Sequence, residues 1–396
     1  YCAPSFYAYQ ATTKFADNPA YALSGPATNS PYALAAAYLF AFAMADILRR
    51  ILKPSHAHLS SASTLLTWII RPALLGSSGF WLADWVHGLE QLDEATRSTF
   101  LVIKIWTARA VLFLLVAGAW YWYLSPLSLS VLREPTQKRD APPKVALLGF
   151  GNTFGAAFLL FTSLAFSLLF LLSQPMGQLA LSACFVAMVL IAELGDSERD
   201  ARLLAASKMP NAKDLSASPS HAPSLLEIVC IGLLGFVAFF STGHQATFTA
   251  IQWRVAFVGF PVVTYPWSPL FVVLNAFGPL SILPAFGVVL LTLWNVAPTR
   301  AKVQQEETGH VRPMRLPGDI LRSALGLLLY VGVLTWSAAL WAWFFRRHLM
   351  LFKIWVPRYM MAGLGLLITD VALLGAVAVA WWIAARTAKA FGTLYT

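Results

Sequence analysis

The sequence predicts an all-α polytopic membrane protein with about nine transmembrane helices and one re-entrant or interfacial segment. Of its 396 residues, 58% are hydrophobic and 12% are charged, and the mean hydropathy is +0.65. Because soluble proteins carry roughly 25% charged residues, this composition excludes a soluble globular domain. The 15 Trp, 12 Tyr and 27 Phe residues suit lipid-facing surfaces and interfacial aromatic belts. The net charge of +10 does not indicate nucleic acid, because the basic residues gather in short loops, where they orient helices and meet anionic lipids.

Nine apolar stretches are long enough to cross a bilayer, which takes about 20 residues. They cover residues 31–48, 63–86, 100–124, 145–173, 175–194, 223–240, 270–294, 318–345 and 359–385. We expect the second stretch to be kinked, because it contains Arg71-Pro72. Gln174-Pro175 predicts a tight turn between the fourth and fifth. Residues 1–31 are predicted to form a lumenal or interfacial loop, and residues 32–396 a single multi-pass domain without an internal repeat.

Several polar or small residues within these stretches have a structural interpretation. Lys104 is expected to extend from its helix to the membrane surface, and Arg109 to face other helices. Asp319 is expected to cap the helix that follows it, and Asp370 to have a partner on another helix. We expect close helix packing rather than nucleotide binding for three glycines, Gly149, Gly151 and Gly155.

No pattern in the chain predicts a metal site. The three cysteines, Cys2, Cys184 and Cys230, lack metal-ligand spacing, and the His56-Ala57-His58 pair lies in a basic loop without further ligands. A cytoplasmic juxtamembrane role is therefore favoured for these histidines. The chain begins at Tyr1 without a signal-peptide pattern, from which we expect a truncated start.

The basic loops predict the orientation of the helices. Loops rich in Lys and Arg face the cytoplasm, which places residues 49–61, 125–144, 195–222 and 295–317 inside. Residues 87–99, 243–269 and 346–358 then lie on the other side. Because a single crossing fits between Gly243 and Trp294, the proline-rich stretch 251–269 is expected to be re-entrant or interfacial.

Two stretches on this non-cytoplasmic side have unusual compositions. Residues 241–260 read STGHQATFTAIQWRVAFVGF, in which a helix can end at Gly243 and the next two side chains can reach interfacial water or a lipid head group. Arg254 then lies in an apolar run, where an arginine is costly unless paired. Residues 346–361 read RRHLMLFKIWVPRYMM, and their basic residues contradict the charge rule at the same face.

These two stretches resemble the GPI ethanolamine phosphate transferases, and most closely the type 3 enzyme. The resemblance implies that the chain is the C-terminal membrane part of a longer enzyme of the endoplasmic reticulum membrane. That enzyme transfers phosphoethanolamine from phosphatidylethanolamine to the third mannose of the GPI precursor. The resemblance also implies a small membrane partner subunit for stability, and a lumenal catalytic domain like alkaline phosphatase, with two zinc ions and a threonine nucleophile. No part of these 396 residues matches that domain, so whether this chain is itself an enzyme stays open.

The hypothesis for the site is a lumenal pocket at the membrane edge that binds the phosphate of a lipid head group. Its expected residues are His244, Gln245, Arg254, Arg346, Arg347, His348, Lys353 and Arg358. The competing interpretation is structural. In it, Arg254 pairs with Glu227 or Asp370, His244 caps a helix end, and the basic cluster contacts lipid phosphates without specificity.

Two other functions remain open. Proline-broken helices beside charged residues also occur in secondary transporters, although repeat symmetry is missing here. The chain could also be a non-catalytic membrane interaction subunit. Upstream sequence that encodes a lumenal domain with an Asp/His/Thr metal set would favour the transferase.

Overall fold

The structure is a computed structural model, and it describes residues 31–56, 60–89, 92–124, 152–207, 222–244, 251–296, 316–347 and 355–394. Within these ranges the chain is predominantly helical and contains no strand, which confirms the all-α polytopic class. The predicted loop 1–31, apart from its last residue, lies outside the described residues. So do Gly149 and Gly151.

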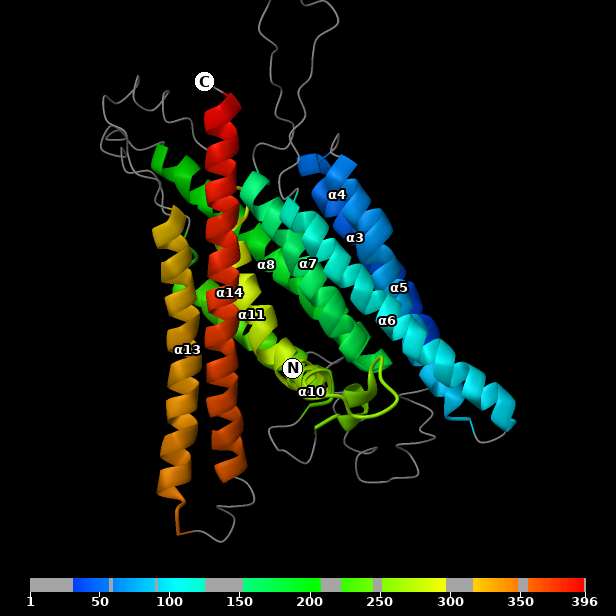
Figure 1. Cartoon of the computed structure of the whole chain (residues 1–396). Helices are drawn as coiled ribbons and strands as arrows, with labels where there is room; N and C mark the ends of the chain where they lie inside the picture. The colour runs from blue at the N-terminus through cyan, green and yellow to red at the C-terminus, as the bar shows by residue number, and fades with distance from the viewer. Residues whose placement is uncertain are drawn as a thin grey trace, which may run out of the picture.

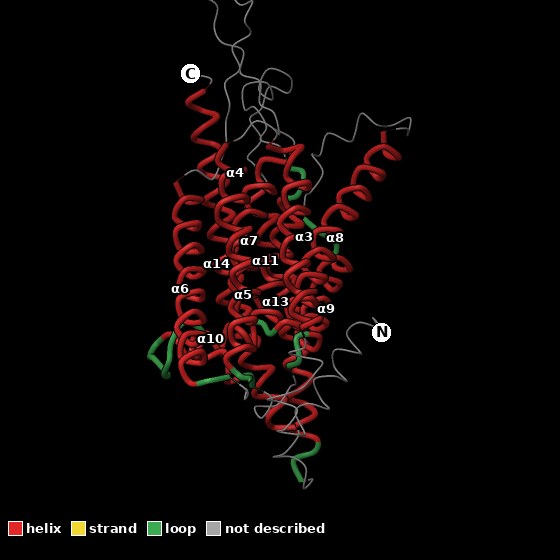
Figure 2. The backbone as a smooth tube through the Cα atoms, turned by 90° about the vertical axis from the view of Figure 1, so that its right-hand side faces the viewer, coloured by secondary structure: helices red, strands yellow, loops and turns green. Residues whose placement is uncertain are grey.

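The helices lie side by side in an elongated bundle (Figures 1 and 2). They are α3 Pro31–His56, α4 Ser60–Thr64, α5 Arg71–His87, α6 Glu94–Leu124, α7 Thr153–Leu172, α8 Pro175–Ser207, α9 Leu225–Ser241, α10 Trp267–Phe277, α11 Leu283–Leu293, α13 Leu316–Phe344 and α14 Val356–Leu394. In the described part of the chain, seven helical segments are long and apolar enough to cross a membrane. These seven match seven of the nine predicted spans. Of the other two, α9 is helical but has 17 residues, and α3 is not among the seven, so the count of nine is approximate.

Two spans contain an irregular turn beside a proline, and the first of them is the span for which a kink was predicted. A π-helical turn, Leu65–Ile70, joins α4 to α5, and at its end the Arg71 N–H donates to the carbonyl of Leu66 five residues back. Pro72 follows directly, so the helix widens just before the residue whose ring would clash with a regular turn. A second π-helical turn, Gly278–Ile282, contains Pro279 and joins α10 to α11 into one span.

Several helix ends differ from the predicted ones. Helix α3 continues through His56 and α8 through Ser207, so polar residues that were expected to form loops extend these two helices. Helix α13 begins at Leu316. The prediction that Asp319 caps this helix is therefore wrong, because Asp319 already lies in its first turn. A carboxylate at that place still interacts favourably with the positive end of the helix dipole.

Two helical spans form the centre of the bundle. In α7 and in the α10–α11 span, 83% of the most apolar window is buried, against 17% in α6 and α13. Gly155 explains how closely the central helices approach, because a Cβ atom there would meet the Leu293 carbonyl oxygen at 2.9 Å. This contact confirms the packing role predicted for Gly155. The exposed side chains of α6 and α13 are mostly large and apolar, which suits contact with lipid.

Successive spans run in opposite directions, so the connections between them divide between two ends. Helices α5, α9 and α13 finish where α6, α10 and α14 begin, and we call this the lower end, as it appears in Figure 1. Helices α9 and α13 run in parallel, because a Cβ at Gly326 would meet Ile228 and a Cβ at Gly232 would meet Tyr330. Among the described residues, the lower end therefore collects 88–89, 92–93, 242–244, 251–266, 345–347 and 355, which include parts of both stretches of unusual composition.

Candidate functional site at the lower end of the bundle

Helix α9 ends as the sequence predicts, at Gly243. Gly243 has a φ of 86°, and its N–H donates to the Phe240 carbonyl. The N–H of His244 donates to the Phe239 carbonyl, and the rings of these two residues stack with centroids 5.3 Å apart. These two hydrogen bonds and the ring contact form a Schellman motif, in which glycine takes the left-handed position at little cost.

His244 points into the protein, and its side chain is 3% exposed. Its Nε2 lies 2.9 Å from Asn275 Oδ1 and its Nδ1 lies 2.9 Å from Thr242 Oγ1. Asn275 in turn donates from Nδ2 to the Leu172 carbonyl, so its Oδ1 is left to accept and Nε2 of His244 carries the hydrogen. The expectation that His244 reaches interfacial water is therefore wrong. It instead ties the end of α9 to α7 and α10, while Gln245 lies outside the described residues.

Burial lowers the pKa of His244 to about 4, and the hydrogen bond to Asn275 opposes this shift without cancelling it. A charged imidazolium would lose its hydration in this position, so the ring is neutral at neutral pH. A neutral histidine makes no electrostatic contribution to binding an anion. His244 is thus a positioning residue for the lower end.

Residues 251–266 form an irregular segment at the same end, with a single 3-10 turn, Trp253–Phe257. Side chains of neighbouring elements satisfy its backbone: Arg109 donates from Nε to the Gly259 carbonyl at 2.9 Å, and Ser268 donates to the Ala256 carbonyl at 2.6 Å. Gln252 reaches back to the Thr242 carbonyl at 2.9 Å. This arrangement agrees with a re-entrant or interfacial segment, since non-helical backbone is tolerated near a membrane where protein groups satisfy it. Arg109, which was expected to face other helices, thus bonds to a carbonyl of this irregular segment.

Arg254 belongs to a charged cluster that we call the Asp84 cluster, formed by Asp84, Lys104 and Arg254. Asp84 Oδ1 accepts from Lys104 Nζ at 2.9 Å, and Asp84 Oδ2 lies 3.6 Å from Arg254 Nη2. The predicted partners of Arg254 are therefore wrong, and Lys104 pairs with an acid instead of extending to the surface. One carboxylate faces two cations, so the cluster keeps a positive charge, and the Arg254 side chain is 45% exposed.

The partners that the sequence suggested for Arg254 are placed elsewhere. Glu227 closes a capping box with Ser224 at the start of α9, at the other end of the bundle. Asp370 lies in the middle of α14, and its Oδ1 has no hydrogen-bond partner among the described residues. Asp84 itself was missed by the sequence analysis. The available signal was a pair of opposite charges, Asp84 and Lys104, on two spans joined by a short loop.

The second stretch places its arginines at the lower tip of the α13–α14 hairpin, which reaches beyond the rest of the bundle (Figures 1 and 2). Arg346, Arg347 and Arg358 are exposed, while His348 and Lys353 lie outside the described residues. The Arg346 and Arg358 guanidinium groups lie 5.3 and 5.6 Å from the ring centroids of Trp343 and Trp355. Aromatic and basic residues in this combination are typical of a membrane interface.

A groove of about 280 Å³ lies among α9, α13, α14 and the π-helical turn before α11. Its wall is formed by Gly232, Phe236, Phe239, Phe240, Leu280, Pro284, Leu327, Tyr330, Val331, Leu334, Thr335, Ala338, Arg358, Met361, Ala362, Gly365 and Thr369. The hydroxyls of Thr335 and Thr369 bond to helix carbonyls, so the wall is almost entirely apolar. Arg358 is its one charged residue.

The structure brings together part of the predicted site and separates the rest. Phe239 and Phe240, which precede the Gly-His turn, line the same groove as Arg358 from the second stretch. Arg254 pairs instead with Asp84 of α5, and Figure 1 shows α5 and α6 on the opposite flank of the bundle from α13. The lower end therefore has two separate positive positions, the Asp84 cluster and the hairpin tip with the groove.

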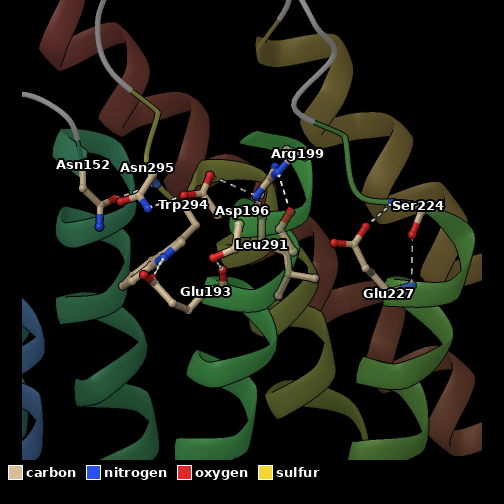
Figure 3. Close-up of polar contacts among 11 residues, drawn as sticks. Asn152, Glu193, Asp196, Arg199, Ser224, Glu227, Leu291, Trp294 and Asn295 are labelled. Atoms are coloured by element: carbon tan, nitrogen blue, oxygen red, sulfur yellow. Dashed lines mark hydrogen bonds and ion pairs between the residues drawn. The ribbon is translucent and has the colours of Figure 1, made fainter. Parts of the chain in front are cut away.

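The opposite end of the bundle contains a polar cluster that connects helices (Figure 3). Trp294 donates to Glu193 at 2.7 Å, and Asn295 donates from its backbone to Asn152 and from its side chain to Asp196. These bonds join the end of α11 to α7 and α8. These polar groups form hydrogen bonds with one another, so we interpret the cluster as a structural connection between helices.

Within the described ranges, no group of three or more His, Cys, Asp or Glu residues is placed to hold a metal ion. The side chains of His56 and His58 lie outside the described residues, so their predicted juxtamembrane role stays a prediction. Cys184 is buried and Cys230 is exposed.

No family model and no solved structure matches this chain. Curated relatives do match it. The chain is 33% identical over 259 residues to GPI ethanolamine phosphate transferase 3 of Eremothecium gossypii, and 30% identical over 270 residues to the protein of the same name in Saccharomyces cerevisiae. It is 28% identical over 285 residues to GPI ethanolamine phosphate transferase 3, catalytic subunit, of Homo sapiens.

These matches cover 65%, 68% and 65% of this chain, but 22%, 23% and 25% of the relatives. The chain thus spans about a quarter or less of the length of the relatives it matches. Over that part, the resemblance expected from the two unusual stretches is shown, and this multi-pass membrane chain is similar in sequence to the GPI ethanolamine phosphate transferases 3.

Proposed function

We propose that this chain is the membrane part of a GPI ethanolamine phosphate transferase of type 3. The observation that carries the proposal is the similarity to three proteins of that name, extending over about two thirds of the chain. In this proposal the complete enzyme transfers phosphoethanolamine from phosphatidylethanolamine to the third mannose of the GPI precursor. It acts in the endoplasmic reticulum membrane, with the lower end facing the lumen.

The role of this chain is to hold phosphate-bearing lipids at the lumenal edge of the membrane. The lower end offers Arg254 beside a single carboxylate, and it offers Arg346, Arg347 and Arg358 at the hairpin tip. Guanidinium groups bind phosphate oxygens through pairs of hydrogen bonds. Two positive positions on opposite flanks fit an enzyme with two phosphate-bearing lipid substrates.

The chemistry itself belongs, in this proposal, to a catalytic domain with two zinc ions that lies outside these residues. Binding a lipid in a fixed orientation near such a domain lowers the barrier of transfer, because part of the entropic cost is met on binding. A small membrane subunit that stabilises the complete enzyme is the further partner that the resemblance implies.

A chimaeric enzyme tests the proposal. The matching membrane segment of the Saccharomyces cerevisiae relative would be replaced by this chain, and phosphoethanolamine addition to GPI precursors would be measured in cells that lack the native enzyme. We expect transfer to the third mannose to be retained. A chimaera that is expressed and inserted at normal level but leaves GPI precursors without this group would contradict the proposal.

A further inference from the structure

We infer that the groove among α9, α13 and α14 holds one acyl chain of a membrane phospholipid, with the lipid phosphate bound at Arg358. The inference deepens the proposed function and rests on it for the link to transfer. It names the groove as the place where a phospholipid is held, while the proposed function concerns the reaction of the complete enzyme.

The first argument is the distribution of polarity along the groove. Arg358 lies in the first turn of α14 at the lower end. The wall farther up the helix consists of apolar side chains, Tyr330, and two threonines whose hydroxyls are already bonded. A ligand that fits this wall is apolar over most of its length and negatively charged at one end. A phospholipid has this pattern, because its charged phosphate is followed by a long apolar acyl chain. The guanidinium group of arginine is well suited to bind the phosphate.

The second argument is the length of the groove. Arg358 and Thr369 of α14 both line it, eleven residues apart in the sequence. At a rise of 1.5 Å per residue this separation corresponds to about 16 Å along the helix. One leaflet of a bilayer has a hydrocarbon depth of about 15 Å. An acyl chain that starts at the lower interface therefore spans the groove without crossing into the other leaflet.

The third argument is how the groove is kept open. Small residues, Ala338, Ala362 and Gly365, leave space in the wall, whereas the Tyr330 ring fills the space beside Gly232. Phe239 and Phe240 form its lower wall, and their carbonyls accept the hydrogen bonds of the Gly243 turn. Stacking of Phe239 on His244 fixes the ring direction. The first unusual stretch thus shapes a groove whose charged residue comes from the second.

The probe is phosphatidylethanolamine with a photoactivatable group on one acyl chain, supplied to the full-length protein in detergent micelles that contain no other phospholipid. After irradiation, labelled peptides are identified by mass spectrometry. We expect labels on the groove-facing residues of α9, α13 and α14 in the wild-type protein. Unlabelled phosphatidylethanolamine, phosphatidylcholine and GPI precursor are added as competitors, and competition by the phospholipids is expected.

Two variants and their matched controls make the test specific. Ala338→Phe fills the groove and is expected to lower labelling about tenfold, whereas Ala339→Phe, one residue along α13 and outside the wall, leaves it unchanged. Arg358→Gln removes the phosphate partner and is expected to lower labelling severalfold. Arg386→Gln, an exposed arginine near the other end of α14, leaves it unchanged. Arg358 is exposed, so this variant keeps the fold.

Equal labelling of the groove in Ala338→Phe and wild-type protein would overturn the inference. So would labels confined to other faces, competition by GPI precursor alone, or a cross-link from the groove to a co-purifying protein. Transfer activity is measured on the same preparations. A wild-type protein that labels in the groove but transfers no phosphoethanolamine contradicts the proposed function alone, and one that transfers without groove labelling contradicts this inference alone.

Discussion

Polar residues at the lower end differ in what their surroundings let them do. His244 is enclosed by Thr242, Asn275 and the ring of Phe239, and all its hydrogen-bonding capacity is used within the protein. Arg254 is nearly half exposed and shares its carboxylate with Lys104. The histidine therefore organises the end of the bundle, and the arginine remains available to an external anion.

The neutral state of His244 predicts a pH dependence of stability. Its pKa is lowered to about 4 in the folded protein from 6.5. Between these values the unfolded chain binds a proton that the folded protein excludes, so stability is complete above pH 6.5 and falls as the pH approaches 4. The difference at pH 4.5 amounts to about 2–3 kcal/mol.

Thermal unfolding of wild-type protein and His244→Gln between about pH 7.5 and about pH 4.5 measures this effect. These two pH values lie about one unit above and about two units below the unperturbed pKa of histidine. Glutamine keeps a polar group in the same place but does not titrate in this range. We expect the wild-type midpoint to fall more steeply with acid than that of the variant. Parallel curves would mean that His244 does not control the pH response.

Arg254 is predicted to act on binding more than on stability. We expect Arg254→Leu in the full-length enzyme to reduce phosphoethanolamine transfer about tenfold or more, since a charged hydrogen bond to phosphate contributes about 1.5–3 kcal/mol. Protein level is expected to change little, because an exposed ion pair contributes about 1 kcal/mol or less and Lys104 still neutralises Asp84. Arg386→Leu is the control at the other end. Normal transfer by Arg254→Leu would exclude the arginine from the site.

At the scale of elements, helix α9 has a defined start and a defined end. Ser224 and Glu227 form a capping box at its first turn, and the Gly243 motif closes its last turn. With 17 residues, α9 is short for a crossing helix. Because the capping box and the Gly243 motif fix its two ends, the Phe239 and Phe240 side chains lie at one defined height beside the hairpin tip.

The end of α9 predicts a position-specific glycine effect. Gly243→Ala is expected to destabilise the protein by about 1–2 kcal/mol, because a residue with a Cβ pays this cost at a positive φ. Gly318→Ala is the matched control, since Gly318 lies in the first turn of α13 with open space around its Cα. There we expect no loss, and a gain of about 0.5–1 kcal/mol at most. Thermal unfolding of both variants measures the difference. A lower midpoint for Gly243→Ala alone would confirm the effect of the positive φ, whereas equal losses in both variants would contradict it.

At the scale of the whole molecule, the alternating helices bring three distant parts of the chain to one end. The described residues 88–89, 242–244 and 345–347 are separated widely in sequence, yet the direction of α5, α9 and α13 delivers all of them to the lower end. The central helices are mostly buried, while α6 and α13 present large apolar side chains outward. This arrangement suits a bundle surrounded by lipid, with its polar contacts at its two ends.

The topology predicts which positions react from the same side of a membrane. In a cysteine-free background, Ala95→Cys and Arg347→Cys are expected to react with an impermeant maleimide from the lumenal side, and Ala201→Cys from the cytoplasmic side. All three residues are exposed near helix ends. Sealed vesicles of known orientation give the measurement. Labelling of positions 95 and 347 from opposite sides would contradict both the fold and a shared lower end.

The sequence by itself determined the helical class, most spans, the stop at Gly243 and the face that collects both unusual stretches. These features depend on local hydrophobicity, on turn residues and on charge in the loops, which neighbouring residues already define. The tertiary structure decided which polar groups meet. Asp84 rather than Glu227 or Asp370 pairs with Arg254, His244 turns inward to Asn275, and Arg358 joins Phe239 and Phe240 at one groove. Such pairings depend on how helices rotate and pack against each other, and residues far apart in the sequence set that packing together.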